Sequence, residues 1–252
     1  MNQDNTTKKM RLEGKLLIGG TITVKTGLSI GGSKSGIDIG ALDNPVIKYK
    51  KGNKDVPYIP GSSLKGKLRA LLAKVAGSAN EKEDKKLMDT DNNSDFKHLA
   101  RVFGYAPGAD DASGEALLKV RDCFLVSESL GETEEKMENS IDRITGKANP
   151  RPIERVLPET VFEIDMCLDV YGEEEAKEHL QLIDLAFELL NQDYLGGGGT
   201  RGNGRVKTNV EVREYLKING QKKMLETDTK IFSSVHFSNG MHDENKDTQT
   251  QA

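Results

Sequence analysis

Apolar residues recur along the chain with two periods, and each period predicts a different kind of element. Where apolar and polar residues alternate, the pattern is typical of a β-strand with one buried face. The strand candidates are 14–28, 116–126, 161–171 and 206–216. Where apolar residues recur every three or four positions, the pattern indicates a helix with one apolar face. The helix candidates are 64–75, 96–103 and 173–191.

Polar segments separate these elements and define the insertions. Residues 77–95 are charged and poor in apolar side chains, so we expect an inserted segment there. Residues 127–139 predict an acidic loop, and the proline-containing residues 141–158 predict an extended projecting arm. The alternation of strands and helices favours an α+β fold with a ferredoxin-like, RRM-like βαββαβ core and long insertions. A doubly wound sheet is the alternative, but too few helices are visible for it.

The two ends of the chain differ from this core. Residues 1–11 are polar and lack the apolar centre of a signal peptide, which predicts a cytoplasmic protein. The pattern fades after residue 217, so we expect one domain over 1–216 and a C-terminal extension over 217–252 with a disordered end. No apolar run approaches the roughly 18 residues of a membrane span.

Charge is unevenly distributed along the chain. The net charge of −4 over 252 residues excludes a globally basic nucleic-acid-binding protein. Eight cations and one anion nevertheless lie between Val46 and Lys74, whereas eight acids and one lysine lie between Glu159 and Glu178. A polyanion could bind the basic segment while the acidic segment stays away from it. Chance clustering on a solvated surface is the alternative.

Several kinds of site are excluded by the residue types present. Cys123 and Cys167 form no metal or redox motif, and the four histidines are scattered without zinc-ligand spacing. Aromatic residues make up only 5% of the chain and tryptophan is absent. Stacking surfaces of the RNA-recognition-motif type need exposed aromatics, so contacts to a nucleic-acid backbone should dominate over base contacts.

A glycine loop precedes the last strand candidate. Six glycines lie between Gly196 and Gly204, and such loops let backbone N–H groups approach a phosphate closely. Arg201 and Arg205 inside the loop favour this interpretation. The loop is not a P-loop, because Gly-Lys-Ser/Thr is missing, and it does not open a helix as a dinucleotide fingerprint does. A flexible hairpin turn is the alternative.

A second candidate is the basic start of the helix that follows Pro60. Ser62 or Ser63 could cap its free N–H groups, and a helix N-terminus favours anions. Lys65, Lys67 and Arg69 add positive charge within one or two turns of this start. Gly66 costs about 1 kcal/mol against alanine inside a helix, which predicts that something packs closely there. An ordinary amphipathic helix with a solvated basic face is the alternative.

Asp43 lies in a loop just before Pro45 and is the third candidate. A carboxylate beside a basic helix start could hold Mg²⁺ against a phosphate or act on a 2′-hydroxyl. Asp38 is a nearby second candidate. On spacing alone, an Asx turn ahead of Pro45 is the favoured interpretation of Asp43.

Taken together and in this order, the motifs resemble those of the RAMP superfamily of CRISPR-associated proteins. Within it the match is to the repeated backbone subunit of type III-A (Csm) effector complexes. The segments that carry the resemblance are Thr26–Ser33, Ile39–Ile47, Tyr58–Arg69, Ile141–Thr145, Ala148–Arg151, Ile153–Val156 and the glycine loop with Arg201. The resemblance covers 14–216, and neither the 77–95 insertion nor the tail after Lys217 contributes to it.

The resemblance implies that copies of the chain stack along a guide RNA with other Csm subunits and bind target RNA, with no membrane involved. The helix start and the glycine loop would hold guide phosphates, and the arm over 127–158 would be a thumb that flips nucleotides. Asp43 matches the family's catalytic aspartate, with Mg²⁺ or another divalent cation as its cofactor and Asp43 as ligand. The expected RNA-binding residues are Lys48, Ser62, Ser63, Lys65, Lys67, Arg69, Arg143, Arg151, Gly196, Gly197, Gly198, Gly199 and Arg201.

Three functions remain open at this stage. The first is an RNA-guided endoribonuclease subunit that cleaves target RNA at regular intervals through Asp43. The second is a non-catalytic scaffold that binds guide RNA while other subunits do the chemistry. The third is a RAMP that processes precursor guide RNA. Such RAMPs often use His or Tyr near the glycine loop, where this chain has Tyr194 but no histidine.

Overall fold

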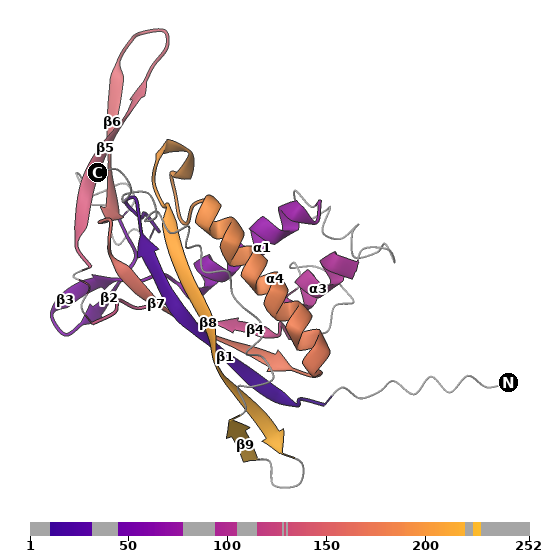
Figure 1. Cartoon of the computed structure of the whole chain (residues 1–252). Coiled ribbons are helices and arrows are strands. Elements are labelled where there is room, and N and C mark those ends of the chain that lie inside the picture. The colour runs from indigo at the N-terminus through magenta and orange to yellow at the C-terminus, as the bar shows by residue number, and fades with distance from the viewer. Residues whose placement is uncertain are drawn as a thin grey trace, which may run out of the picture.

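One antiparallel sheet forms the body of the molecule (Figure 1). The computed structural model describes residues 11–31, 45–77, 94–104, 115–127, 129, 131–219 and 224–227. The strands of this sheet, in spatial order, are β4 (Leu118–Val120), β7 (Val161–Val170), β1 (Gly14–Val24), β8 (Val206–Asn219) and β9 (Met224–Thr227). The central strand β1 pairs with β7 on one side and β8 on the other, so Gly14 lies opposite both Val170 and Lys217.

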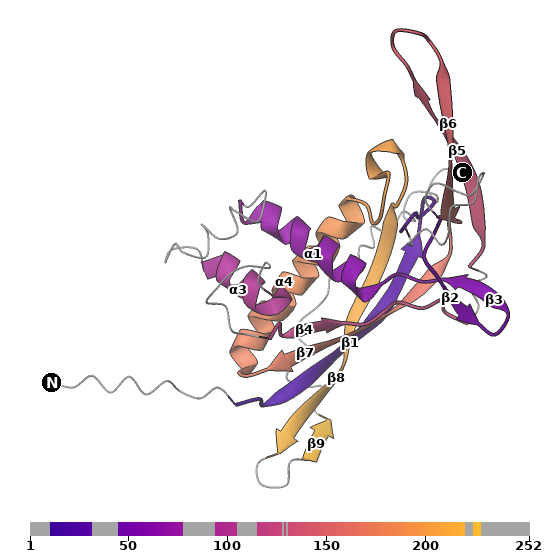
Figure 2. The same ribbon diagram turned by 180° about the vertical axis from the view of Figure 1, so that it is seen from behind.

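Three helices cover one face of this sheet, as both views show (Figures 1 and 2). They are α1 (Gly61–Val75), α3 (Ser94–Phe103) and α4 (Glu173–Gln192). Every second side chain of β1 and β7 points to the helices and is buried, as the two-residue period requires. The apolar face of α4 packs on the same core through Leu180, Ile183 and Phe187. None of the helices in the described part is long and apolar enough to span a membrane.

The mixed α/β fold with an antiparallel sheet confirms the predicted fold class at this level. The strand and helix candidates appear as β1, α1, α3, β7, α4 and β8 within a few residues of their expected bounds. The candidate over 116–126 is shorter than expected, since only Leu118–Val120 forms a strand and Cys123 and Leu125 make isolated bridges. The C-terminal extension adds β9, which pairs with the end of β8 and was not expected.

Two hairpins project from this body on the same side of the sheet (Figure 2). The shorter one consists of β2 (Lys48–Lys51) and β3 (Lys54–Pro57), and the longer one of β5 (Thr133–Ile141) and β6 (Ala148–Val156). The longer hairpin is the expected arm, but the prediction of an acidic loop over 127–139 was wrong for its second half. An exposed two-stranded hairpin has no buried face, so its strands lack the apolar alternation that marks a strand.

The start of α1 also differs from expectation. The N-cap is Pro60, and no serine side chain caps the helix. The Asp122 carboxylate instead accepts a hydrogen bond from the Gly61 N–H at 2.8 Å. Gly66 is exposed, and a Cβ built on it meets no atom of the described residues within 4 Å, so close packing against them does not explain this glycine.

The core under α1 makes a matched stability test. Leu68 is completely buried, whereas Val75 at the end of the same helix is 61% exposed. We predict that Leu68→Ala lowers the free energy of unfolding by about 2–5 kcal/mol, because it removes packed methyl groups and leaves a cavity. Val75→Ala should stay within about 0.5 kcal/mol of wild type. Urea unfolding of both variants measures this, and equal losses would contradict the described core.

Candidate nucleic-acid interface

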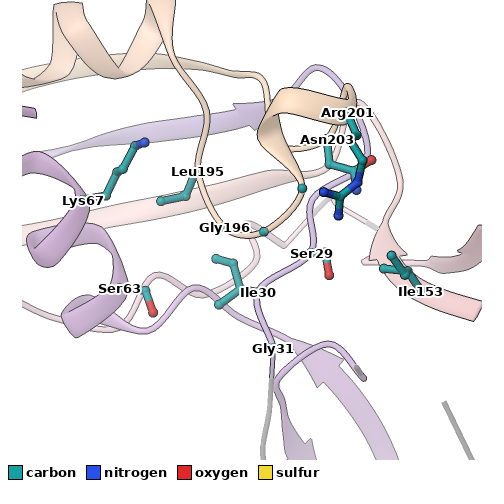
Figure 3. A pocket seen from close by; sticks show the side chains of 12 residues that line it. Ser29, Ile30, Gly31, Ser63, Lys67, Ile153, Leu195, Gly196, Arg201 and Asn203 are labelled. Atoms are coloured by element: carbon teal, nitrogen blue, oxygen red, sulfur yellow. The ribbon is translucent and has the colours of Figure 1, made fainter. Parts of the chain in front are cut away.

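A pocket of about 650 Å³ lies between the glycine loop, the first turns of α1 and the segment 29–31 (Figure 3). Ser63 and Lys67 enter it from α1, and Arg201 enters it from the glycine loop. Ile153 of β6 contributes from the long hairpin. Among the residues that the structure describes, the lining contains two cations, backbone groups and hydroxyls but no carboxylate, so this part of the pocket suits an anion.

The glycine loop takes its shape from a close contact with the segment 27–29. The Gly197 N–H donates to the Ser29 carbonyl at 2.7 Å, and the Gly204 N–H donates to the Gly27 carbonyl at 3.0 Å. Gly196 has φ +77°, and a Cβ there would lie 2.3 Å from the Ser29 carbonyl oxygen. Only glycine fits this position. The Gly196 N–H, at the pocket wall, donates to no acceptor among the described residues.

Both pocket cations are held by carboxylates outside the pocket. The Lys67 Nζ lies 3.0 Å from an Asp193 oxygen and 3.9 Å from the centre of the Tyr194 ring. The Arg201 Nε lies 3.0 Å from an oxygen of Glu138 on β5. Burial raises the pKa of Glu138, but hydrogen bonds from Arg201 and Lys136 outweigh it and leave that pKa lowered. Lys67 is thus held at the pocket by a partly buried pair, whereas Arg201, whose side chain is 61% exposed, is paired at the surface.

Asn203 links the pocket to the base of the long hairpin, and it was missed from the sequence. Its side chain is 2% exposed, and its Oδ1 accepts a hydrogen bond from Arg155 at 3.0 Å. Arg155, on β6, also bonds Glu134 of β5 at 2.7 Å. The Asn203 Nδ2 has no partner among the described residues. An asparagine inside a run of glycines was the only signal in the sequence.

The expected binding residues of α1 do not all face this pocket. Ser63 and Lys67 line it, and Ser62 is exposed on the first turn beside it. Lys65 donates to the Leu118 carbonyl at 2.7 Å, and Arg69 donates to the Gly104 carbonyl at 3.3 Å, both away from the pocket. Residues two apart on a helix differ by about 200°, so Lys65 and Lys67 point in different directions. Burial and then the Lys119 charge lower the pKa of Lys65.

Lys48 is engaged by a buried carboxylate. It forms an ion pair with Glu154 of β6, whose residue is only 5% exposed. Glu154 also accepts hydrogen bonds from the Val46 N–H at 2.9 Å and the Thr133 hydroxyl at 2.7 Å. Burial raises the pKa of Glu154, but these donors outweigh it and lower that pKa overall. The network joins the base of the long hairpin to the segment that follows Asp43.

The remaining expected residues lie elsewhere or outside the described part. Arg143, at the tip, and Arg151, on β6, are exposed on the long hairpin. Gly197 and Gly198 line the pocket, whereas Gly199 does not and instead packs against Tyr194. The predictions for Asp43 and Asp38 fall outside the described residues.

No metal centre is formed by the residues that the structure describes. No group of three or more His, Cys, Asp or Glu side chains in them could hold an ion. The described part of the pocket lining offers nitrogen donors and hydroxyls rather than carboxylates. Divalent cations prefer carboxylate oxygens, so these described residues supply no ligand of that kind.

The comparison with known families decides the classification. A family model described as the RAMP superfamily matches residues 16–207. The chain belongs to the RAMP superfamily. The resemblance drawn from the motifs is therefore confirmed for the family, and this RAMP chain carries the glycine loop and the basic helix inside the matched region.

Curated relatives extend the match over most of this RAMP chain. The CRISPR system Cms endoribonuclease Csm3 of Streptococcus thermophilus is 43% identical over 201 residues, which cover 76% of this chain and 86% of the relative. The Csm3 of Enterococcus italicus is 41% identical over 202 residues, which cover 77% of this chain and 89% of the relative. Among solved structures, the type III-B Cmr-beta complex bound to cognate target RNA contains a chain that matches with a TM-score of 0.54 and 16% identity. The match covers 81% of this chain and 61% of that chain. This last likeness shows the fold alone.

The Glu154 network gives a pH-dependent prediction. Glu154→Gln should lower the free energy of unfolding by about 1–3 kcal/mol at neutral pH, because Lys48 loses its anionic partner. The folded pKa of Glu154 is depressed, so its stabilisation is present above the unfolded value of about 4.3 and is lost as pH falls through the folded pKa.

Urea unfolding of wild type and Glu154→Gln across this pH range measures the difference. Glu159→Gln is the control, because the Glu159 side chain is 71% exposed in its pair with Lys25. If the difference in free energy of unfolding between wild type and Glu154→Gln does not decrease on acidification, the described network is contradicted.

Proposed function

We propose that this chain is the guide-RNA-binding backbone subunit of a type III-A CRISPR effector complex and cleaves bound target RNA. The observation that carries the proposal is the pocket formed by the glycine loop, Ser63, Lys67 and Arg201, whose described lining is positively charged. The Csm3 relatives, at 43% and 41% identity, are named endoribonucleases. Guide RNA, target RNA, other copies of the chain and other Csm subunits are the proposed partners.

The pocket suits one phosphodiester of the guide. A phosphate there would meet the Lys67 and Arg201 charges, the Ser63 hydroxyl and the Gly196 N–H. These groups contact no base edge, so they would hold guides of any sequence. Indifference to sequence is what a guide-binding subunit needs, because each guide differs.

Asp43 is the proposed catalytic residue. Two described residues that flank its segment, Gly31 and Val46, form an antiparallel bridge, and the Ile47 N–H donates to the Ile30 carbonyl at 2.9 Å. Since Ile30 and Gly31 also line the pocket, the segment that carries Asp43 leaves and rejoins the fold beside it. This placement supports a carboxylate that acts on RNA near the bound guide.

A divalent cation, with Asp43 as its protein ligand, belongs to the proposal. The described residues supply no further carboxylate for it at the pocket, so phosphate oxygens of the RNA would complete its ligands. When bound, such an ion stabilises negative charge that develops on phosphate and leaving-group oxygens.

A ferredoxin-like core and a thumb are also part of the proposal. The order β4-β7-β1-β8, with α1 and α4 each connecting two strands, supports a ferredoxin-like core. The exposed long hairpin with Arg143 and Arg151 supports a thumb that inserts between guide and target. A cytoplasmic location follows from the proposed work on intracellular RNA.

Two lysines of α1 give a matched test of the pocket. We predict that Lys67→Ala weakens binding of guide RNA and reduces the slope of log K against log salt by about 0.7, because one phosphate contact is lost. Lys65→Ala should keep the slope of wild type, since Lys65 is bonded to the Leu118 carbonyl instead. Fluorescence anisotropy at several salt concentrations measures both. Equal slopes for the two variants would refute this assignment of the pocket.

The catalytic role is tested by Asp43→Asn, which keeps the size of the side chain and removes its charge. In a guide-loaded assembly we predict normal target binding and a loss of cleavage of about 100-fold or more. Asp38→Asn is the matched control and should retain cleavage. Wild type in a chelator should lose activity and regain it with Mg²⁺. If Asp43→Asn cleaves as wild type does, the chain is a non-catalytic scaffold or acts through another residue.

A further inference from the structure

Three aromatic side chains from separate segments meet at the base of the short hairpin. Tyr49 lies on β2, Tyr58 follows β3, and Phe124 follows β4. The Tyr58 and Phe124 rings are stacked with centres 5.9 Å apart and planes 25° apart. Tyr49 meets both rings edge-on, at 5.9 Å from Tyr58 and 5.1 Å from Phe124. We call these three rings the aromatic patch.

The backbone beside the patch holds the rings in place. Ile59 and Cys123, the neighbours of Tyr58 and Phe124, form a bridge with two hydrogen bonds of 3.0 and 2.8 Å. Both bridge residues are completely buried. Phe124 itself is 45% exposed, and both tyrosines are partly exposed. The patch is therefore a fixed aromatic surface that remains open to solvent.

Positive charge adjoins the patch on the same hairpin. Lys50, Lys51 and Lys54 are exposed around its turn, and Lys50 pairs with Asp55 at 2.8 Å. Lys51 and Lys54 have no anionic partner among the described residues. Rings that stay exposed beside unneutralised lysines match the chemistry of a nucleotide, whose base stacks on rings and whose phosphates pair with cations.

The composition of the patch argues against a protein partner. In the described part of the chain, Phe124 is the only exposed large hydrophobic side chain that belongs to the patch. The others are on the helices, at Val75 and Leu185, or on the long hairpin, at Met137, Ile141 and Ile144. A stable protein interface needs a broader apolar centre with few charges. One exposed ring with two partly exposed tyrosines is sufficient for a single base.

We propose that the aromatic patch stacks an unpaired RNA base while Lys51 and Lys54 contact the adjoining phosphates. This inference rests on the proposed function, since it assigns to the same protein a second RNA contact of different chemistry. The glycine-loop pocket takes backbone phosphates, which paired and unpaired strands both offer. The patch takes a base, which only an unpaired or flipped nucleotide offers, because bases in an A-form duplex are already stacked. The chain would thus distinguish a displaced nucleotide from a paired one.

The test compares binding of a fluorescein-labelled single-stranded oligouridylate with binding of an RNA duplex of the same length. Phe124→Leu keeps an apolar side chain but removes the ring, and should weaken binding of the single strand about tenfold. The affinity of this variant for the duplex should stay within twofold of wild type, because the bases of a duplex are already stacked on one another. Phe124→Trp should restore binding of the single strand. Circular dichroism and urea unfolding check that the variants are folded.

The lysines are tested through salt dependence. The double variant Lys51→Gln with Lys54→Gln should reduce the salt slope for the single strand by about 1.4, because two phosphate contacts are lost. Lys74→Gln is the matched control, since Lys74 is an exposed lysine in the last turn of α1, and it should leave the slope unchanged.

The outcomes separate this inference from the proposed function. If wild type binds single strands through Lys67 but Phe124→Leu binds them equally well, the patch is not a base-binding surface and the proposed function stands. If Phe124→Leu reduces assembly with other copies or subunits and leaves RNA affinity unchanged, the patch is a protein contact and the inference is overturned. If wild type binds neither RNA, both proposals fail.

To assign the strand, 5-iodouridine is placed in either the guide or the target of the assembled complex and irradiated. A cross-link to the peptide that contains Phe124 supports the inference and names the strand. Loss of this cross-link in Phe124→Leu is the control. No cross-link from either strand would overturn the inference for the assembled complex.

Discussion

The contact between the glycine loop and the segment 27–29 is the constraint on which the pocket depends. Two backbone hydrogen bonds join these segments, and the Gly196 Cα lies so close to the Ser29 carbonyl that a side chain cannot be placed there. The loop follows α4, and the segment follows β1, so the contact brings together two parts of the chain that are far apart in sequence. Without it, Arg201 and Lys67 would not share one pocket.

Charge pairing then connects this pocket to the long hairpin. Arg155 bonds both Asn203 and Glu134, and Glu138 holds Arg201. A ligand that draws Arg201 toward a phosphate therefore competes with a carboxylate on β5. Binding in the pocket and the position of the hairpin are linked through this shared arginine. On the far side of the hairpin base, Glu154 joins Val46 and Lys48 to β6 in the same manner.

The sequence was sufficient for the elements with a buried face and insufficient for those without one. Strands β1, β7 and β8 and helices α1 and α4 have an apolar period, and their positions were predicted. Strands β2, β3 and β5 are stabilised by cross-strand pairing at the surface, which leaves no period. Composition also carries no information on where the aromatic residues lie. A total of 5% does not show that Tyr49, Tyr58 and Phe124 converge from segments up to 75 residues apart.

Helical direction explains why the cations of α1 do not all face the pocket. A run of cations in sequence indicates charge but not the side on which each cation lies, and Lys65 and Lys67 point to different neighbours. The Ser63 and Lys67 face could be selected only once the glycine loop was placed. Asn203 and Glu154 were identified only from the structure for the same reason, since each has a hydrogen-bond partner at least 48 positions away in the sequence.

The length of the long hairpin has a mechanical consequence. Each strand has nine residues, so at about 3.3 Å per residue the hairpin extends roughly 30 Å, which is close to the diameter of a small domain. Its base is joined to the body of the molecule by the pair between Arg201 and Glu138, while Ile144 at its tip is 96% exposed. The hairpin is therefore fixed at one end, and a force on its tip acts on its base through a lever arm of about 30 Å.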